Sequence, residues 1–260
     1  MHLKTPSGFA LGLMVVTAAC GGGNQQAPAS NAGAPAAAAA VDAATAGSIT
    51  GKVTFEGTAP RNEPIKMAAD PVCVQQNKGA QTQETYMVGS GGELQNVFVY
   101  VKDGLGSLTF PVPTEPVTLD QQGCRYHPHV FGIMVGQPLS IVNSDPTLHN
   151  IHATPKVNTE FNTGQPIQGM KTSHTFTTKE VIMPFKCDVH GWMNAYVGIL
   201  DHPYYAVSGA DGKFEIKNLP PGAYTIEAWH EKGGTQTQMV TIGAKEAKDI
   251  AFTFKAAATN

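Results

Sequence analysis

Short runs of alternating apolar and polar residues, separated by glycine, proline or asparagine, are the feature that most limits how this chain can fold. They recur after residue 48 and include 49–55, 97–101, 139–143 and 195–200. β-Branched and aromatic residues at every second position are typical of half-buried strands. The 28 glycines and 18 prolines disfavour helix interiors and suit the turns between strands. We therefore predict an all-β protein built from one or two sandwiches.

The charge balance excludes one broad class of function. The chain carries 17 Lys and Arg against 20 Asp and Glu, which gives a formal net charge of -3. Neutralising the phosphates of DNA or RNA requires a clustered surplus of basic side chains. We therefore expect no nucleic-acid partner.

The N-terminal residues 1–20 are typical of an export signal. Lys4 precedes an apolar run at 9–16 that is too short to span a bilayer, and small residues then lead to Cys20. The two alanines before Cys20 resemble the lipobox of bacterial lipoproteins, although Thr17 stands where leucine is usual. The resemblance implies that Cys20 is lipidated and anchors a periplasmic or cell-surface protein to a bacterial membrane. The alternative is an ordinary cleaved signal that contains a cysteine.

Residues 21–47 are rich in Gly, Ala, Pro, Asn and Gln and almost free of charge. Such a segment cannot bury enough apolar surface to offset its ordering entropy, so we predict a flexible linker. A flexible coil of this length reaches roughly 30 Å. The folded part would then hang from the membrane and stay free to meet partners.

A turn-and-strand pattern near the C-terminus carries a first family resemblance. Residues 211–226 read D-G-K-F-E-I-K-N-L-P-P-G-A-Y-T-I, in which two turns punctuate alternating apolar side chains. This pattern resembles the carboxypeptidase regulatory-like, or transthyretin-like, β-sandwich. Residues 51–55 and 96–101 look like the earlier strands of that family.

The separation of these pieces suggests an insertion. We expect 48–104 and 204–256 to form the two parts of one transthyretin-like sandwich, with 105–203 inserted between them as a second domain. Insertions succeed at exposed loop tips because domain termini often lie close together. Three consecutive modules in simple sequence order are the alternative.

Four metal-binding side chains occur within the expected insert. Cys187, His190 and Met193 follow the pattern C-x2-H-x2-M, and His149 lies near the end of another predicted strand. Two imidazoles, one thiolate and one thioether are the ligand set of a blue-copper site. A loop can direct three side chains at one ion only if they recur every few residues, so the fourth must come from a neighbouring strand.

The surrounding sequence resembles the cupredoxins of the plastocyanin and amicyanin group over most of 117–200. The resemblance rests on an ordered series of motifs, which comprises Tyr126-His-Pro, Val135-Gly-Gln-Pro-Leu-Ser-Ile-Val-Asn, Asn143-Ser-Asp followed by His149-Asn, and His174-Thr-Phe-Thr. It implies a Greek-key β-sandwich in which Asn150 braces the ligand loop through hydrogen bonds. The copper ligands that it implies are His149, Cys187, His190 and Met193.

The function implied is that of a membrane-tethered electron carrier with one type 1 (blue) copper. Its partners would be redox proteins such as a cytochrome or an oxidase. Four protein ligands leave no open position for a substrate, so we do not expect an enzyme. Zinc is disfavoured because its structural sites rarely use methionine. A copper-delivery protein, or a surface structural module stabilised by a metal, are the alternatives.

Two further cysteines lie outside the ligand loop. In an oxidising compartment Cys73 and Cys124 are expected to form a disulfide that joins the first domain to the insert. The alternative is a second metal site made by Cys124, His127 and His129, which lie within six residues of one another.

Overall fold

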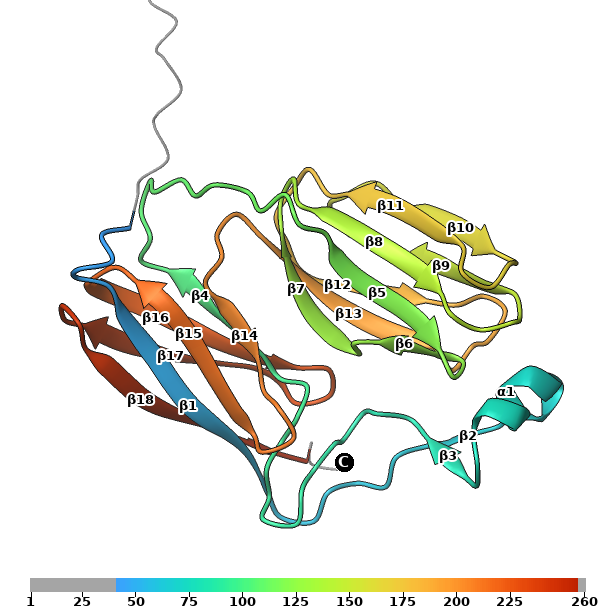
Figure 1. Ribbon diagram of the computed structural model, residues 1–260. Helices are drawn as coiled ribbons and strands as arrows, with labels where there is room; N and C mark the ends of the chain where they lie inside the picture. The colour runs from blue at the N-terminus through green and yellow to red at the C-terminus, as the bar shows by residue number, and fades with distance from the viewer. Residues whose placement is uncertain (1–40, 257–260) are drawn as a thin grey trace, which may run out of the picture. The chain divides into compact units, whose positions relative to one another are not determined.

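The computed structural model of the chain describes residues 41–256 (Figure 1). The expected signal peptide 1–20, the expected lipidation site Cys20 and most of the expected linker lie outside these residues. At the end of that linker, the carbonyl of Asp42 accepts hydrogen bonds from the backbone of two following residues, and the first strand begins at Gly47. Among the described residues, no helix is long and apolar enough to cross a membrane.

The first sandwich is assembled from both ends of the described chain. One sheet has the strand order β15-β1-β18 and the other has the order β14-β4-β16-β17. Its strands are β1 (Gly47–Glu56), β4 (Phe98–Asp103), β14 (Tyr205–Val207), β15 (Lys213–Leu219), β16 (Gly222–His230), β17 (Gly234–Ile242) and β18 (Ala247–Lys255). Apolar side chains from both sheets form one buried core. In this sandwich β1 and β4, which precede residue 117, therefore pair with strands that follow residue 200.

The second sandwich is contiguous in sequence. A five-stranded sheet has the order β10-β9-β12-β13-β7, and a four-stranded sheet has the order β11-β8-β5-β6. Its strands are β5 (Val117–Gln122), β6 (Arg125–His127), β7 (Val130–Met134), β8 (Pro138–Asn143), β9 (His149–Ala153), β10 (Phe161–Gln165), β11 (Lys171–Thr175), β12 (Glu180–Lys186) and β13 (Asn194–Leu200). A second core of buried side chains draws on both sheets. The expected domain boundaries, 48–104, 105–203 and 204–256, stay predictions. An insertion requires that strands before and after the inserted segment pair with each other, as those of the first sandwich do.

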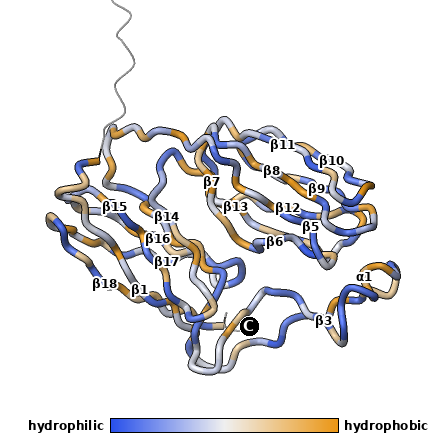
Figure 2. Tube along the Cα trace, in the orientation of Figure 1, coloured by the Kyte–Doolittle hydropathy of each residue, from blue (hydrophilic) through white to orange (hydrophobic). Residues whose placement is uncertain are grey.

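The alternation seen in the sequence matches burial in the structure. Buried residues occupy every second position of β8, and they alternate in the same way along most of β15. Hydrophobic and hydrophilic residues accordingly alternate along the strands in Figure 2. The prediction of an all-β protein is confirmed, because sheets account for nearly all of the regular structure.

Two strand glycines allow the sandwiches to meet closely. A Cβ atom on Gly132 of β7 would overlap the ring of Tyr205, and one on Gly198 of β13 would overlap the ring of Phe98. Phe98 and Tyr205 belong to β4 and β14 of the first sandwich, and their rings stack with centroids 5.6 Å apart. Glycine is therefore required at these positions because an aromatic ring occupies the place of the missing side chain.

A small segment, residues 64–82, lies between β1 and β4 in the chain. It holds β2 (Pro64–Ile65), the 3-10 turn η1 (Met67–Ala69), the helix α1 (Pro71–Gln76) and β3 (Gln81–Thr82). The helix begins where Asp70 accepts a hydrogen bond from the Val72 backbone N–H at 2.8 Å and proline occupies the first helical position. A disulfide joins Cys73 of α1 to Cys124, in the turn between β5 and β6.

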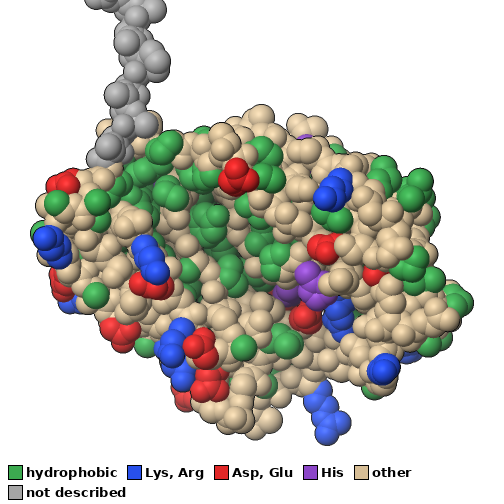
Figure 3. Space-filling view, viewed as in Figure 1, with side chains coloured by type: hydrophobic (Ala, Val, Ile, Leu, Met, Phe, Trp, Pro, Cys, Tyr) green, Lys and Arg blue, Asp and Glu red, His purple; other side chains and the backbone are tan. Residues whose placement is uncertain are grey.

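The surface mixes charges of both signs. On the face drawn in Figure 3, blue and red side chains lie interspersed rather than in separate fields. Pairs such as Lys52 with Glu93 and Lys255 with Glu56 are exposed. Exposed pairs contribute only about 0–1 kcal/mol each. The two apolar cores, rather than surface ion pairs, therefore stabilise the fold.

Candidate metal centre

One end of the five-stranded sheet brings together residues from three elements. His149 is the first residue of β9, and Cys187 directly follows β12. His190 lies in the loop to β13, and Met193 is the last residue before that strand. Because Lys186 of β12 pairs with His152 of β9, the start of the loop lies beside the start of β9. The sheet register thus places a strand end next to a loop that carries three ligand-type side chains.

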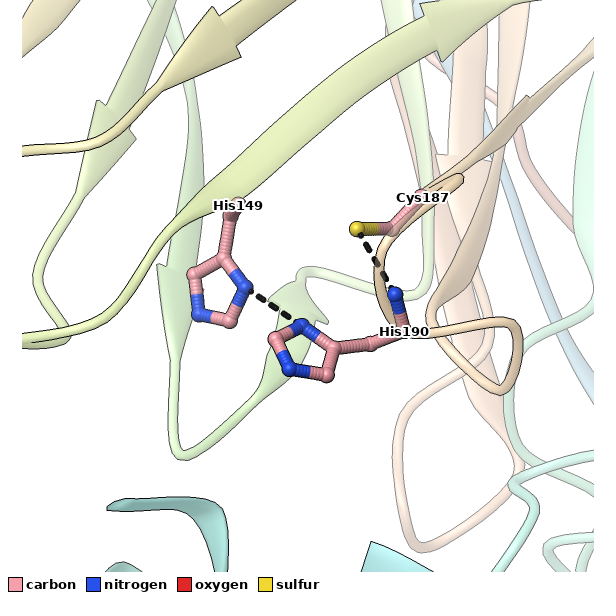
Figure 4. Close-up of side chains that lie close together, drawn as sticks. All are labelled: His149, Cys187 and His190. Carbon is pink, nitrogen blue, oxygen red and sulfur yellow. Dashed lines mark hydrogen bonds between the residues drawn. The ribbon is translucent and has the colours of Figure 1, made fainter. Parts of the chain in front are cut away.

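The two histidines and the cysteine converge on one buried point. Figure 4 shows both imidazoles and the thiol facing one another. The Nδ1 atoms of His149 and His190 are 2.9 Å apart. One nitrogen of each ring and the sulfur of Cys187 all lie within 4.8 Å of one another, and all three residues are buried. Three of the four predicted copper ligands therefore meet, while their assignment as ligands stays a prediction.

Met193 lies in the same buried cluster. Its side chain is 1% exposed and belongs to the core that includes Cys187. Its carbonyl accepts a hydrogen bond from the Cys187 backbone N–H at 3.1 Å, and its own N–H donates to the His190 carbonyl at 2.8 Å. These two bonds close the loop 187–193 on itself.

The surroundings of Cys187 favour the thiolate, the form that binds metals. Burial raises the pKa of the thiol, but hydrogen bonds with His149, His190 and Asn150 outweigh burial and lower the pKa to about 6. The backbone N–H of His190 donates to the sulfur at 3.3 Å. A large fraction of the sulfur is therefore ionised at neutral pH, before any metal binds.

Asn150 hydrogen-bonds to the loop that follows Cys187, and its role as a brace of a copper site stays a prediction. Its Oδ1 accepts hydrogen bonds from the backbone N–H groups of Asp188 at 2.8 Å and Val189 at 3.3 Å. The same oxygen lies 3.2 Å from the sulfur of Cys187. One side chain on β9 therefore fixes the first half of the loop against the strand that carries His149.

Two carboxylates, which sequence reasoning missed as site residues, contact the outer nitrogens of the histidines. The Nε2 of His149 lies 2.8 Å from Asp145, and the Nε2 of His190 lies 3.0 Å from Asp70. Asp145 also accepts the backbone N–H groups of Gly123 and Cys124. Each ring therefore directs one nitrogen inward and offers the other to a carboxylate.

These contacts shift the pKa values of both partners in the buried pair. Burial lowers the pKa of His149, but hydrogen bonds with Asp145 and Cys187 outweigh it, so the pKa is raised overall. Burial raises the pKa of Asp145, but hydrogen bonds from His149 and two backbone amides outweigh burial, so the pKa is lowered overall. Asp145 is therefore a carboxylate at neutral pH. It belongs to the Asn-x-Asp motif quoted above, which was its only signal in the sequence.

The alternative second metal site does not form in the described part of the chain. The sulfur of Cys124 is bonded to that of Cys73. His129 instead places its Nε2 2.7 Å from Glu231 of the first sandwich, and its side chain is 5% exposed. His127 is exposed at the end of β6. Cys124, His127 and His129 are therefore not brought together around one point.

Comparisons with known proteins find fold likenesses at low similarity. No protein-family model matches the chain, and no curated protein matches it. A Cu-containing nitrite reductase from Thermus scotoductus SA-01 is 21% identical, with a TM-score of 0.33, over 36% of this chain and 24% of its own. A purple cupredoxin from Nitrosopumilus maritimus is 20% identical, with a TM-score of 0.28, over 32% of this chain and 98% of its own. A mutant of amicyanin in its oxidised state is 22% identical, with a TM-score of 0.29, over 32% of this chain and 81% of its own.

The matched part is thus about a quarter of the nitrite reductase and most of the two smaller proteins. What characterises the site chemically is its own donor set, not these likenesses. A buried sulfur of lowered pKa and two converging imidazoles are soft and borderline ligands, which suit copper or zinc and not magnesium or calcium.

Proposed function

We propose that this chain transfers electrons through one mononuclear type 1 copper ion, bound by His149, Cys187 and His190 with Met193 as the axial ligand. The observation that supports the proposal is the convergence of two Nδ1 atoms, 2.9 Å apart, beside a buried free cysteine. A trigonal set of two histidines and one cysteine with a weak axial methionine is the blue-copper arrangement. When bound, copper supplies a one-electron couple that no side chain in this cluster provides.

The residues of the chain would keep the site the same in both oxidation states. The closed loop 187–193 and the brace at Asn150 hold the ligand-type side chains in place without a metal. Burial of His149 and Cys187, at 0% and 2% exposed, keeps water away from the inward-facing atoms. Small rearrangement on gain or loss of an electron is what a carrier needs, and this rigidity is why we favour a carrier over a copper-delivery protein.

Location and partners complete the proposal. A lipid on Cys20 would anchor the chain to a bacterial membrane, in the periplasm or on the cell surface, and the linker would let the folded part reach a cytochrome-like or oxidase-like protein. The support is the apolar run and the small residues before Cys20. The first sandwich, which we propose to be transthyretin-like, would serve as a scaffold.

The test is a visible absorption spectrum of the full chain loaded with Cu(II). We expect an intense thiolate-to-copper charge-transfer band that ascorbate bleaches and an oxidant restores. Cys187→Ser and His149→Gln should abolish the band. His152→Gln should keep the band. His152 lies on the same strand as His149, but its two ring nitrogens form hydrogen bonds with Asp188 and Glu160.

Two results would refute the electron-carrier proposal. One is the absence of the band in the unmodified chain, with zinc or no metal found by elemental analysis. The other is that the band forms but the protein loses its copper to a competing chelator during one redox cycle. That result would favour a copper-delivery protein.

A further inference from the structure

The segment 64–82 covers the outer edge of His190. Its helix is bonded to the second sandwich through the Cys73–Cys124 disulfide. Next to that bridge, the Asn77 side chain donates to the carbonyl of Gly123 at 2.9 Å. The sulfur of Cys73 itself lies 3.7 Å from the Nε2 of His190. As a result His190 is only 3% exposed, although it stands in a loop at the end of the sheet.

Asp70 is the residue that this segment presents to the centre. Its carboxylate contacts the Nε2 of His190 at 3.0 Å, and it also accepts from the Thr147 hydroxyl and the Val72 backbone N–H, both at 2.8 Å. These three contacts fix the orientation of the side chain toward His190.

The arrangement determines which nitrogen of His190 carries the proton. Its Nδ1 faces inward, 2.9 Å from the Nδ1 of His149, so a metal held there requires the Nδ1 lone pair. The proton then sits on Nε2 and is donated to Asp70. A carboxylate that accepts this proton raises the basicity of the imidazole as a ligand. A more basic ligand favours the more highly charged, oxidised metal over the reduced one.

We propose that Asp70 is a positioning residue that lowers the reduction potential of the centre through His190, and that the disulfide between Cys73 and Cys124 holds it there. The inference rests on the proposed function, because it requires a redox-active metal at the inward nitrogens. Asp145 makes the equivalent contact to His149 from only four residues away. Asp70 comes from 120 residues before its histidine, so its contact depends on the anchoring of a separate segment.

The test is a spectroscopic redox titration of the copper-loaded full chain and of Asp70→Asn. Asparagine keeps the size of the side chain and an oxygen for the Val72 N–H, but it removes the charge. At a fixed potential we expect the ratio of oxidised to reduced protein to fall about tenfold, which is a rise in potential of about 59 mV for a one-electron couple. The matched control is Asp211→Asn, which removes the same charge from an exposed turn of the first sandwich and should change the ratio less than twofold.

Further measurements separate positioning from plain structural support. The charge-transfer band of Asp70→Asn should keep its wavelength, and a thiol count should show the disulfide intact. The double variant Cys73→Ala with Cys124→Ala, which frees the segment but keeps the carboxylate, should shift the ratio in the same direction. An intact band with an unchanged ratio in either Asp70→Asn or the double variant overturns the inference and leaves the proposed function standing. Absence of the band in the unmodified chain overturns both.

Discussion

Loss of the disulfide between Cys73 and Cys124 should cost this chain a large part of its stability. The two cysteines are 51 residues apart, and the bridge therefore closes a long loop in the unfolded chain. The chain-entropy relation gives about 4 kcal/mol for a loop of this length. The suitable change is Cys73→Ala with Cys124→Ala, because both positions are 0% exposed and serine would bury two hydroxyl groups.

The measurement is equilibrium unfolding of the metal-free protein in urea, followed by tryptophan fluorescence. Trp192 reports on the bridge directly, since its indole N–H donates to the Cys124 carbonyl at 3.0 Å. Cys187→Ala is the matched control, because it removes an equally buried sulfur without opening a loop and should cost about 1 kcal/mol. If the double variant loses no more free energy of unfolding than this control, loop closure does not explain what the bridge contributes.

Three further predictions test the core, the acid stability and the brace. Gly198→Ala should lower the free energy of unfolding by about 1–3 kcal/mol, because the new methyl group overlaps the ring of Phe98. Gly164→Ala, where the methyl group meets nothing within 4 Å, is the control in the same thermal melts, and equal losses would contradict the packing account. Burial lowers the pKa of His202 to about 4. Below pH 6.5 the unfolded chain therefore binds more protons at this residue, and the free energy of unfolding should fall by up to about 3 kcal/mol between pH 6.5 and 4. His202→Asn should flatten that part of the stability profile, and an unchanged slope would refute this assignment. Asn150→Ala should weaken copper binding about 10–100-fold in a chelator competition, and unaltered affinity would show that the brace is dispensable.

The strands and the ligand-type residues could be predicted because their signals are local. Alternation over five to seven residues reports burial of one face, and it recurs in strands such as β8 and β15. Cys187 and His190 lie three residues apart in one loop, so their convergence requires only that the loop turns. His149 required one further step, the placement of its strand beside that loop.

Asp70 could not be predicted from its neighbours. Its contact with His190 spans 120 residues, and it depends on a segment whose two strands have two residues each and whose helix has six. Elements this short show no periodicity. The sequence pattern around Asp145 did include that residue, but the direction of its side chain toward Nε2 is set by the backbone N–H groups of Gly123 and Cys124.

The interleaved strand order has a consequence for the order in which the parts of the chain acquire their structure. The second sandwich ends at Leu200, whereas β1 must wait for β18, which ends 55 residues later at Lys255. Because a chain emerges from its N-terminus, those 55 residues become available to fold only after the second sandwich. In that interval the sandwich with the ligand cluster can close, and both bridge cysteines are already made. The unpaired β1 and β4 meanwhile present open edges that favour association with other chains. β18 is therefore the strand that ends this exposure, and chains halted before it should aggregate while still holding a folded ligand cluster.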